Sequence, residues 1–186
     1  MEKENKNPSR VQRLLLNHRR LFFYTYSYAN SILNAVLNSL PPLMRDLIFK
    51  ILLREIGSHS LIDYGSYLRY MSKIHIGNNV EINRGFQVYP SMLYKDSKIQ
   101  IEDNVVIGPN VCLYGAGQNS QNGVLIDVAG DITIRKGAYI GGSSLIRYGV
   151  EIGANSIVAA GSVVVKDVPA GSVVGGNPAS FIRKNR

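Results

Sequence analysis

Cysteine is nearly absent from this chain, since Cys112 is the only one among 186 residues. A single cysteine cannot close an intramolecular disulfide, and it is too few for a metal site built from thiolates. The sequence therefore favours a reducing compartment, the cytoplasm, over a secreted and disulfide-bonded domain. We expect Cys112 itself to be a small packing residue.

Long uninterrupted hydrophobic runs are missing as well. The uncharged stretch 21–44 includes Asn30, Asn34 and Asn38, together with Pro41 and Pro42. A helix that crosses a bilayer needs about 20 predominantly apolar residues, so we do not expect this stretch to span a membrane. The polar start, Met1–Pro8, is not followed by a small-residue cleavage site, which argues against a secretory signal.

Acidic residues are too few to balance the two ends of the chain. Of the net charge of +8, residues 1–55 carry +5, residues 56–180 carry none, and Arg183, Lys184 and Arg186 carry +3. Nucleic-acid-binding proteins more often have a basic stripe across a folded face, so we expect no nucleic acid partner. Basic ends suit a phosphorylated cofactor or an anionic membrane surface better.

Residues 9–55 show helical periodicity and form a basic arm. After Pro41 and Pro42, one apolar stripe comprises Leu43, Leu47, Ile48, Ile51 and Leu52, opposed by Arg45, Asp46, Lys50 and Arg54. This spacing predicts two or three amphipathic helices that cap the next element. Residues 10–28, with four arginines and the aromatic cluster 22–28, could in addition contact the inner face of a membrane.

The dominant pattern begins at Ile134, where every sixth residue is Ile or Val. The six aliphatic positions are Ile134, Ile140, Ile146, Ile152, Val158 and Val164. Four residues after each comes a small or β-branched residue: Ala138, Ser144, Val150, Ser156, Ser162 and Val168. The position between them holds Gly137, Ser143, Gly149, Asn155, Gly161 and Asp167.

A period of six fits neither the helical period of 3.6 nor the strand period of 2. It fits a chain that runs a short strand, turns a corner and repeats. We predict that the large aliphatic residue points inward, that the small one fits beneath the corner, and that Gly or Asn adopts the turn dihedrals. The fold class is therefore mainly β, a single-stranded parallel β-helix over residues 56–175 after the arm 1–55.

Two long interruptions break the repeat, at 89–98 and 118–131. Three hexads make one coil, so Val88, Leu113 and Ile146 should share a face, and both interruptions should leave the same corner one coil apart. Long loops on a rigid scaffold often carry function. Tyr89, Tyr94 and Asp96 in the first loop could bind a sugar, or could simply pack the loop.

The C-terminal coil closely resembles that of hexapeptide-repeat O-acetyltransferases, which modify maltose, galactosides, antibiotics and capsule or O-antigen sugars. The resemblance rests on residues 159–169 (AAGSVVVKDVP), 175–179 (GGNPA) and 182–183 (IR), and it is strongest over 99–186. It implies a left-handed coil and a homotrimer that transfers an acetyl group from acetyl-CoA to a sugar hydroxyl, as in the synthesis of a cell-surface polysaccharide. It implies no metal.

The same resemblance implies cofactor contacts. Gly142 and Ala160 match positions whose backbone lines the pantetheine arm of CoA. Lys166 and Arg183 match positions near its phosphates, where cations are needed. Asn177 and Pro178, in the basic tail 176–186, match residues close to the adenine.

One expected residue is replaced, because relatives carry the catalytic histidine where this chain has Gln118. A carboxamide has no usable basicity, and loss of a general base typically costs about 10²–10⁴-fold in rate. Three alternatives follow. His75, Asp96 or Asp127 could be the base; the loop could be aligned differently, although no histidine follows His75; or the protein could bind its ligands without turnover, as a binding or assembly subunit.

Two other functions of such coils are excluded by scarce residue types. A γ-type carbonic anhydrase needs three histidine ligands for its metal, and after His18 in the arm the chain has only His59 and His75. An ice-binding coil needs rows of threonine, and the chain has only Thr25 and Thr133.

Overall fold

The structure, a computed structural model, describes residues 10–92, 94, 97–121 and 123–185, with side chains from residue 21 onward. It is mainly β, with two α-helices ahead of a series of short strands. Two compact units divide the chain, Met1–Ser39 and Leu40–Arg186. The first contains helix α1 (Arg10–Ser39), and the second contains everything that follows.

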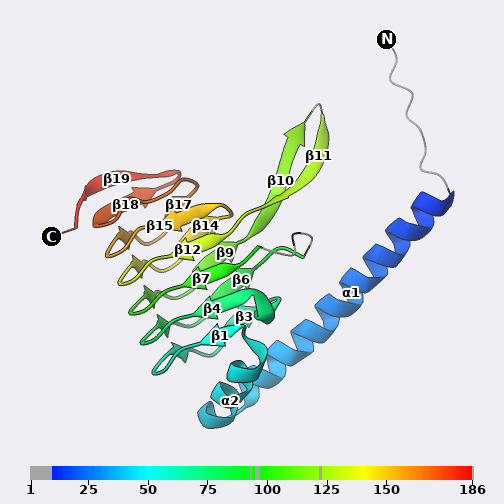
Figure 1. The fold of residues 1–186 in the computed structure, drawn as a ribbon, viewed down its shortest axis with the longest axis horizontal. Coiled ribbons are helices and arrows are strands. Elements are labelled where there is room, and N and C mark those ends of the chain that lie inside the picture. The colour runs from blue at the N-terminus through cyan, green and yellow to red at the C-terminus, as the bar shows by residue number, and fades with distance from the viewer. Residues whose placement is uncertain (1–9, 93, 95–96, 122, 186) are drawn as a thin grey trace. The chain divides into compact units, whose positions relative to one another are not determined.

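Three sheets, named here A, B and C, form the walls of the second unit (Figure 1). Sheet A contains β1 (Glu55–Ile56), β4 (Ile74–Ile76), β7 (Ile99–Ile101), β12 (Ile132–Ile134) and β15 (Val150–Ile152). Sheet B contains β2 (Leu61–Ile62), β5 (Glu81–Ile82), β8 (Val106–Ile107), β13 (Tyr139–Ile140), β16 (Ile157–Val158), β18 (Ser172–Gly176) and β19 (Ala179–Lys184). Sheet C contains β3 (Tyr67–Leu68), β6 (Gln87–Tyr89), β9 (Cys112–Tyr114), β14 (Leu145–Arg147) and β17 (Val163–Val164).

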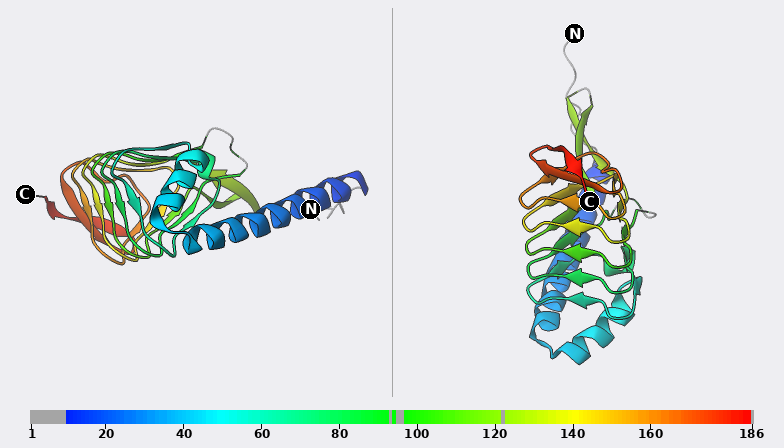
Figure 2. Two further views of the ribbon diagram at one scale, coloured as in Figure 1. Left: turned by 90° about the horizontal axis from the view of Figure 1, so that it is seen from below. Right: turned by 90° about the vertical axis from the view of Figure 1, so that its left-hand side faces the viewer.

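The chain visits sheets A, B and C in turn, and each such circuit is one coil (Figure 2). Strands of successive coils pair in parallel, so that residues of the same hexad position stack along the coil. Val88 lies opposite Leu113, and Leu113 lies opposite Ile146, which confirms the face predicted from the repeat. The parallel pairing of strands in sequence order confirms the mainly β class.

The hexad residues occupy the predicted environments. All six aliphatic positions from Ile134 to Val164 are at most 1% exposed, and the small residues after them are at most 4% exposed. Five of the six turn residues have the left-handed backbone that favours Gly and Asn, as at Gly137 (φ 70°) and Asn155 (φ 54°). Asp167 is outside that set, and its carboxylate instead accepts a hydrogen bond from the backbone N–H of Glu151 at 2.8 Å.

The second interruption is an ordered antiparallel hairpin. Strands β10 (Ala116–Gln121) and β11 (Val124–Ala129) pair with each other and with no other strand, and they extend away from the coil (Figure 1). At the C-terminal end, β19 folds back antiparallel on β18. The sheet therefore ends in a reversed strand, in place of a further coil.

Helix α2 (Pro42–Leu52) caps the first coil, but through a face that the sequence did not predict. Arg45 and Phe49 are the buried residues of α2, whereas Leu43, Leu47 and Ile51 are 86%, 62% and 73% exposed. The Arg45 guanidinium donates hydrogen bonds to the carbonyl oxygens of Ile62 and, at 3.0 Å, Asp63. These carbonyls belong to β2, the terminal strand of sheet B, and to the residue after it. They have no further coil to pair with and need donors, so a cation packs inward in place of the apolar stripe.

The rings of Phe49 and Tyr64 complete the surroundings of Arg45. Its guanidinium carbon lies 4.9 Å from the centroid of Phe49 and 4.4 Å from that of Tyr64. The Tyr64 hydroxyl in turn donates to the carbonyl of Leu40 at 2.9 Å. Burial lowers the pKa of Arg45, and the neighbouring oxygens partly offset that effect.

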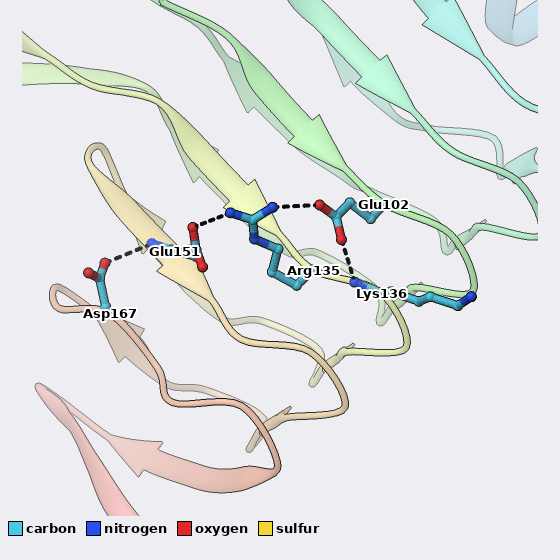
Figure 3. Close-up of polar contacts among 5 residues, drawn as sticks. All are labelled: Glu102, Arg135, Lys136, Glu151 and Asp167. Atoms are coloured by element: carbon cyan, nitrogen blue, oxygen red, sulfur yellow. Dashed lines mark hydrogen bonds and ion pairs between the residues drawn. The ribbon is translucent and has the colours of Figure 1, made fainter.

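Charged side chains tie the later coils together on the outside of sheet A (Figure 3). Arg135 bridges Glu102 of one neighbouring coil at 2.8 Å and Glu151 of the other at 2.7 Å. The second oxygen of Glu102 accepts the backbone N–H of Lys136 at 2.9 Å. The Arg135 guanidinium lowers the pKa of Glu151, and both carboxylates raise the pKa of Arg135.

Candidate active site

The two interruptions meet outside the corner between sheets C and A. The Tyr94 hydroxyl, from the first loop, donates to the backbone carbonyl of Asp127 in β11 at 3.0 Å. Across the hairpin, the Gln118 amide nitrogen lies 3.4 Å from the Asp127 carboxylate. The structure thus gathers Tyr94, Gln118 and Asp127, and both loops leave one corner as predicted from the repeat. Asp96 lies outside the described residues.

Tyr89 lies in a row of tyrosines on the outer face of sheet C. Its ring centroid is 5.6 Å from that of Tyr67, and it stacks on the ring of Tyr114 with centroids 5.4 Å apart. The Tyr89 hydroxyl donates to Gln87 at 2.8 Å. A hydrogen bond with Cys112 raises the pKa of Tyr114 to about 12. These contacts pack the sheet, and a contact of Tyr89 with sugar stays a prediction.

His75 is separate from this group. It lies on β4 in the outer row of sheet A, where it is paired in register with Glu55 and Gln100. Its Nδ1 atom is 3.5 Å from a Glu55 carboxylate oxygen. His59 occupies a left-handed turn position, with φ of 58°, and is exposed. Neither histidine contacts Gln118 or Asp127 in the described part of the chain.

The corner between sheets B and C, the BC corner, holds four of the six predicted cofactor residues. The chain turns there at Pro109, Gly142 and Ala160 in three successive coils, each followed by a left-handed residue. The Gly161 N–H bonds to the Gly142 carbonyl at 2.9 Å, so these turns stack directly. The turn at Asn177 and Pro178 ends β18 at the same corner, where the Gly176 N–H reaches Ser162 at 3.3 Å.

Gly142 and Ala160 share one property of their backbone. Within the described residues their backbone N–H groups donate no hydrogen bond, although the residues before and after each of them do. At the corner between sheets A and B, side chains serve two of the corresponding groups, since Asp103 accepts from Asn78 and Glu102 accepts from Lys136, whereas the N–H groups of Ala154 and Ala170 donate no hydrogen bond within the described residues. The BC corner therefore presents a short row of donors that an extended chain of amides could use.

The two predicted cations lie elsewhere on the prism. Lys166 follows β17 at the corner between sheets C and A, and it is exposed. Arg183 lies on β19 opposite Val173, away from the Asn177 turn, and is also exposed. Along the chain, Lys166 is one side of the triangular coil away from Ala160.

The pairing of Gln118 with Asp127 was missed in the sequence, although a signal for it exists. The sequence has Asn-Gly at 122–123, a dipeptide typical of two-residue turns between antiparallel strands. Counting outward from that dipeptide pairs Gln121 with Val124 and, three steps on, Gln118 with Asp127, which is the register of the hairpin. The direct neighbour of Gln118 could therefore have been predicted.

Comparison with known proteins identifies the family. Residues 131–166 match the model for the bacterial transferase hexapeptide (six repeats). The chain is 36% identical over 142 residues to YJL218W of Saccharomyces cerevisiae, a protein assigned to the acetyltransferases, covering 74% of this chain and 69% of that one. It is 34% identical over 145 residues to galactoside O-acetyltransferase of Escherichia coli, covering 75% and 68%. The chain belongs to the hexapeptide-repeat acetyltransferases.

Solved structures of this acetyltransferase family share the fold. The hexapeptide-repeat acetyltransferase VCA0836 of Vibrio cholerae, complexed with acetyl-CoA, has a TM-score of 0.77 at 29% identity, covering 88% of each chain. Galactoside acetyltransferase in complex with coenzyme A has a TM-score of 0.76 at 30% identity, covering 87% of this chain and 82% of that one. The family and the class of enzyme expected from the repeat and its tail are thereby confirmed.

A weaker likeness extends to gamma carbonic anhydrase 2 of Arabidopsis thaliana, at 30% identity over 136 residues and only 43% of that protein. Among the residues with a described position, no three His, Cys, Asp or Glu side chains lie close enough together to hold a metal ion. His59 serves as a turn residue and His75 as the partner of Glu55.

Membrane crossing by a helix finds no support in the described residues. Neither α1 nor α2 combines the length and the apolar character that a bilayer span requires.

Proposed function

We propose that this acetyltransferase moves an acetyl group from acetyl-CoA to a hydroxyl group of a sugar, within a cell-surface polysaccharide or its precursor. The observation that carries the proposal is the row of unused N–H donors at Gly142 and Ala160, which ends at the Asn177–Pro178 turn. The pantetheine arm of CoA is an extended chain with two amides, and such a row suits it. The relatives bound to CoA or acetyl-CoA support the same ligand class.

In this proposal the coil is left-handed and the active protein is a homotrimer. The separation of Lys166 and Arg183 from the BC corner supports a site at the junction of two copies, where cations of one copy can reach phosphates held by the next. Residues 1–55 act as the cap of the coil, and 176–186 as the tail that closes the cofactor site. The cytoplasm is the proposed compartment, because the proposed reaction uses acetyl-CoA from the cytoplasm as its acetyl donor.

Asp127 is the base that the geometry favours. An attacking alcohol must lose its proton to a basic atom, which the carboxamide of Gln118 cannot supply. Asp127 has a carboxylate, is exposed, and is held by Gln118 on one side and by Tyr94 through its backbone. In this proposal Gln118 orients the Asp127 carboxylate and is not itself the base. His75 contacts Glu55 on another sheet and takes no part in the reaction.

The reaction balances with these groups. The sugar hydroxyl oxygen forms a bond to the thioester carbonyl carbon while its proton passes to an Asp127 carboxylate oxygen. The carbon–sulfur bond then breaks, the acetyl ester is released, and the proton returns to the CoA thiolate. No metal or oxidant is required.

The direct experiment incubates the purified protein with acetyl-CoA and a panel of mono- and oligosaccharides while free thiol is measured. We expect thiol release that depends on a sugar and continues in His75→Ala. Tight acetyl-CoA binding without release on any sugar would instead establish the binding or assembly role that the Gln118 replacement suggests. Loss of turnover in His75→Ala, with an unchanged KM for acetyl-CoA, would move the base to sheet A.

A further inference from the structure

The outward face of α2 is an unexplained surface of the molecule. Leu43, Met44, Leu47 and Ile51 recur at helical spacing and are 86%, 54%, 62% and 73% exposed. We call these four residues the α2 stripe. The opposite side of the same helix, with Arg45 and Phe49, is buried against the first coil. Four large apolar side chains exposed along one face of a helix form a patch of the kind that marks a contact surface.

We propose that the α2 stripe is the surface by which this protein docks on an anionic lipid bilayer. Basic side chains accompany it: Lys50 is exposed on α2, three residues after Leu47, and Arg54 is exposed two residues after the helix ends. An apolar stripe flanked by cations is the arrangement that places a helix in the headgroup region of a membrane. The acidic Asp46 beside it is partly buried and neighbours the Arg45 guanidinium, which offsets its charge.

Three structural facts make α2 a suitable anchor. The helix is fixed to the coil by hydrogen bonds from Arg45 to the carbonyls of Ile62 and Asp63 and by the buried ring of Phe49. Pro42 stands in its first turn, so the helix begins sharply and Leu43 is presented at its start. The α2 stripe lies on the face away from the coil, so its side chains can enter lipid while the cap stays in place.

The rest of the chain favours lipid over a protein partner at this stripe. Within the second unit, residues 40–55 carry Arg45, Lys50 and Arg54 against Asp46 and Glu55, a net charge of +1, while residues 56–180 are neutral. Each Lys or Arg close to an anionic surface adds an electrostatic attraction, and high salt screens that attraction. A partner protein or a second copy would not need that charge.

Vesicle sedimentation of the full chain tests the docking. We expect wild-type protein to bind vesicles of phosphatidylglycerol and phosphatidylcholine, and to bind far more weakly to pure phosphatidylcholine. The triple variant Leu43→Ser, Leu47→Ser, Ile51→Ser should lower the partition coefficient at least about tenfold, because three apolar side chains leave the interface. The pair Lys50→Gln and Arg54→Gln should lower it about thirtyfold at low salt and much less at high salt.

Leu125→Ser is the matched control. Leu125 is 66% exposed on the β10–β11 hairpin, so this substitution removes a similar apolar side chain from a different surface. It should bind vesicles like wild type. Absence of binding by the wild-type protein, or equal binding by the triple variant, overturns the proposal. So does a fall in the molar mass of the lipid-free triple variant, which would assign the stripe to contacts between copies. The measurement needs no acetyl transfer and is independent of the proposed activity.

Discussion

The carboxylate of Asp127 lies 3.4 Å from the amide nitrogen of Gln118, directly across the β10–β11 hairpin. An amide and an acid therefore stand as partners at the position where the family resemblance predicts a histidine. Two strands hold this pair, so its geometry is fixed by backbone register and does not rely on a flexible loop.

Removing the acid should stop the reaction while leaving binding intact. We expect Asp127→Asn to lower kcat by about 10²–10⁴-fold with little change in the KM for acetyl-CoA, since the variant keeps the shape and loses the proton acceptor. Steady-state kinetics measure both constants. Ser120→Ala, on the same exposed hairpin, is the control and should retain wild-type kcat. Full activity of Asp127→Asn would remove Asp127 from the reaction.

Restoring an imidazole offers the complementary test. Gln118→His should retain or gain activity, and its kcat/KM should fall below about pH 6.5 as the new imidazole becomes protonated and loses its basicity. The pH–rate profile of the variant, compared with that of wild type, shows the change. A variant with wild-type rates and an unchanged profile would mean that position 118 does not face the acceptor.

A proline substitution can delete one N–H donor at the BC corner without disturbing the coil. Pro109 already occupies the position equivalent to Ala160 in an earlier coil, so Ala160→Pro should fold. We expect the Kd for CoA to rise about 2- to 12-fold, as for the loss of one hydrogen bond. Ala154→Pro, at the equivalent place before Asn155 on another corner, should bind CoA normally. Calorimetric titration compares the two variants.

The inward arginine of the cap should contribute measurably to stability. Arg45→Met removes hydrogen bonds to two carbonyls, and we expect a loss of about 2 kcal/mol in the free energy of unfolding, or about 4–8 °C in Tm. Lys50→Met, on the outward side of the same helix, should change Tm very little. Equal Tm values for Arg45→Met and wild type would show that the carbonyls find other donors.

The ion pairs on sheet A predict a pH-dependent contribution to stability. Because Arg135 lowers the folded-state pKa of Glu151, this contribution is present above the unfolded pKa of about 4.3 and is lost as pH falls through the folded value. The Tm of Arg135→Met should therefore lie below that of wild type at pH 7, and the gap should narrow by pH 3. A constant gap would attribute the effect to packing of the arginine chain.

The hexads allowed the walls of the prism to be predicted, because each inward aliphatic residue and each turn glycine has a single place in a coil. The faces of Val88, Leu113 and Ile146 follow from counting alone. The arm was harder. Apolar residues of α2 were expected to cover the coil, but the carbonyls of Ile62 and Asp63 require donors, and this need outweighs the pattern of the helix. Periodicity shows that a face is apolar and does not show which neighbour it meets.

The site was predictable in part for a similar reason. Gly142 and Ala160 stand at equivalent turns, which the repeat reveals, whereas the isolation of His75 depends on which sheet each loop leaves. That information lies in the three-dimensional coil. The partner of Gln118 required the hairpin register, which the sequence carries in Asn122-Gly123.

The stacking of coils also fixes the distance along the coil axis between helix α2 and the β10–β11 hairpin. Helix α2 packs on the first coil, and the hairpin with Asp127 emerges after β9 of the third, two strand spacings further along. Each spacing is about 4.8 Å, so the hairpin departs roughly 10 Å beyond the capped layer. A protein resting on lipid through α2 would thus select acceptors whose reactive hydroxyl stands off the bilayer by a fixed amount, and inserting or deleting one coil would change that reach in a single step.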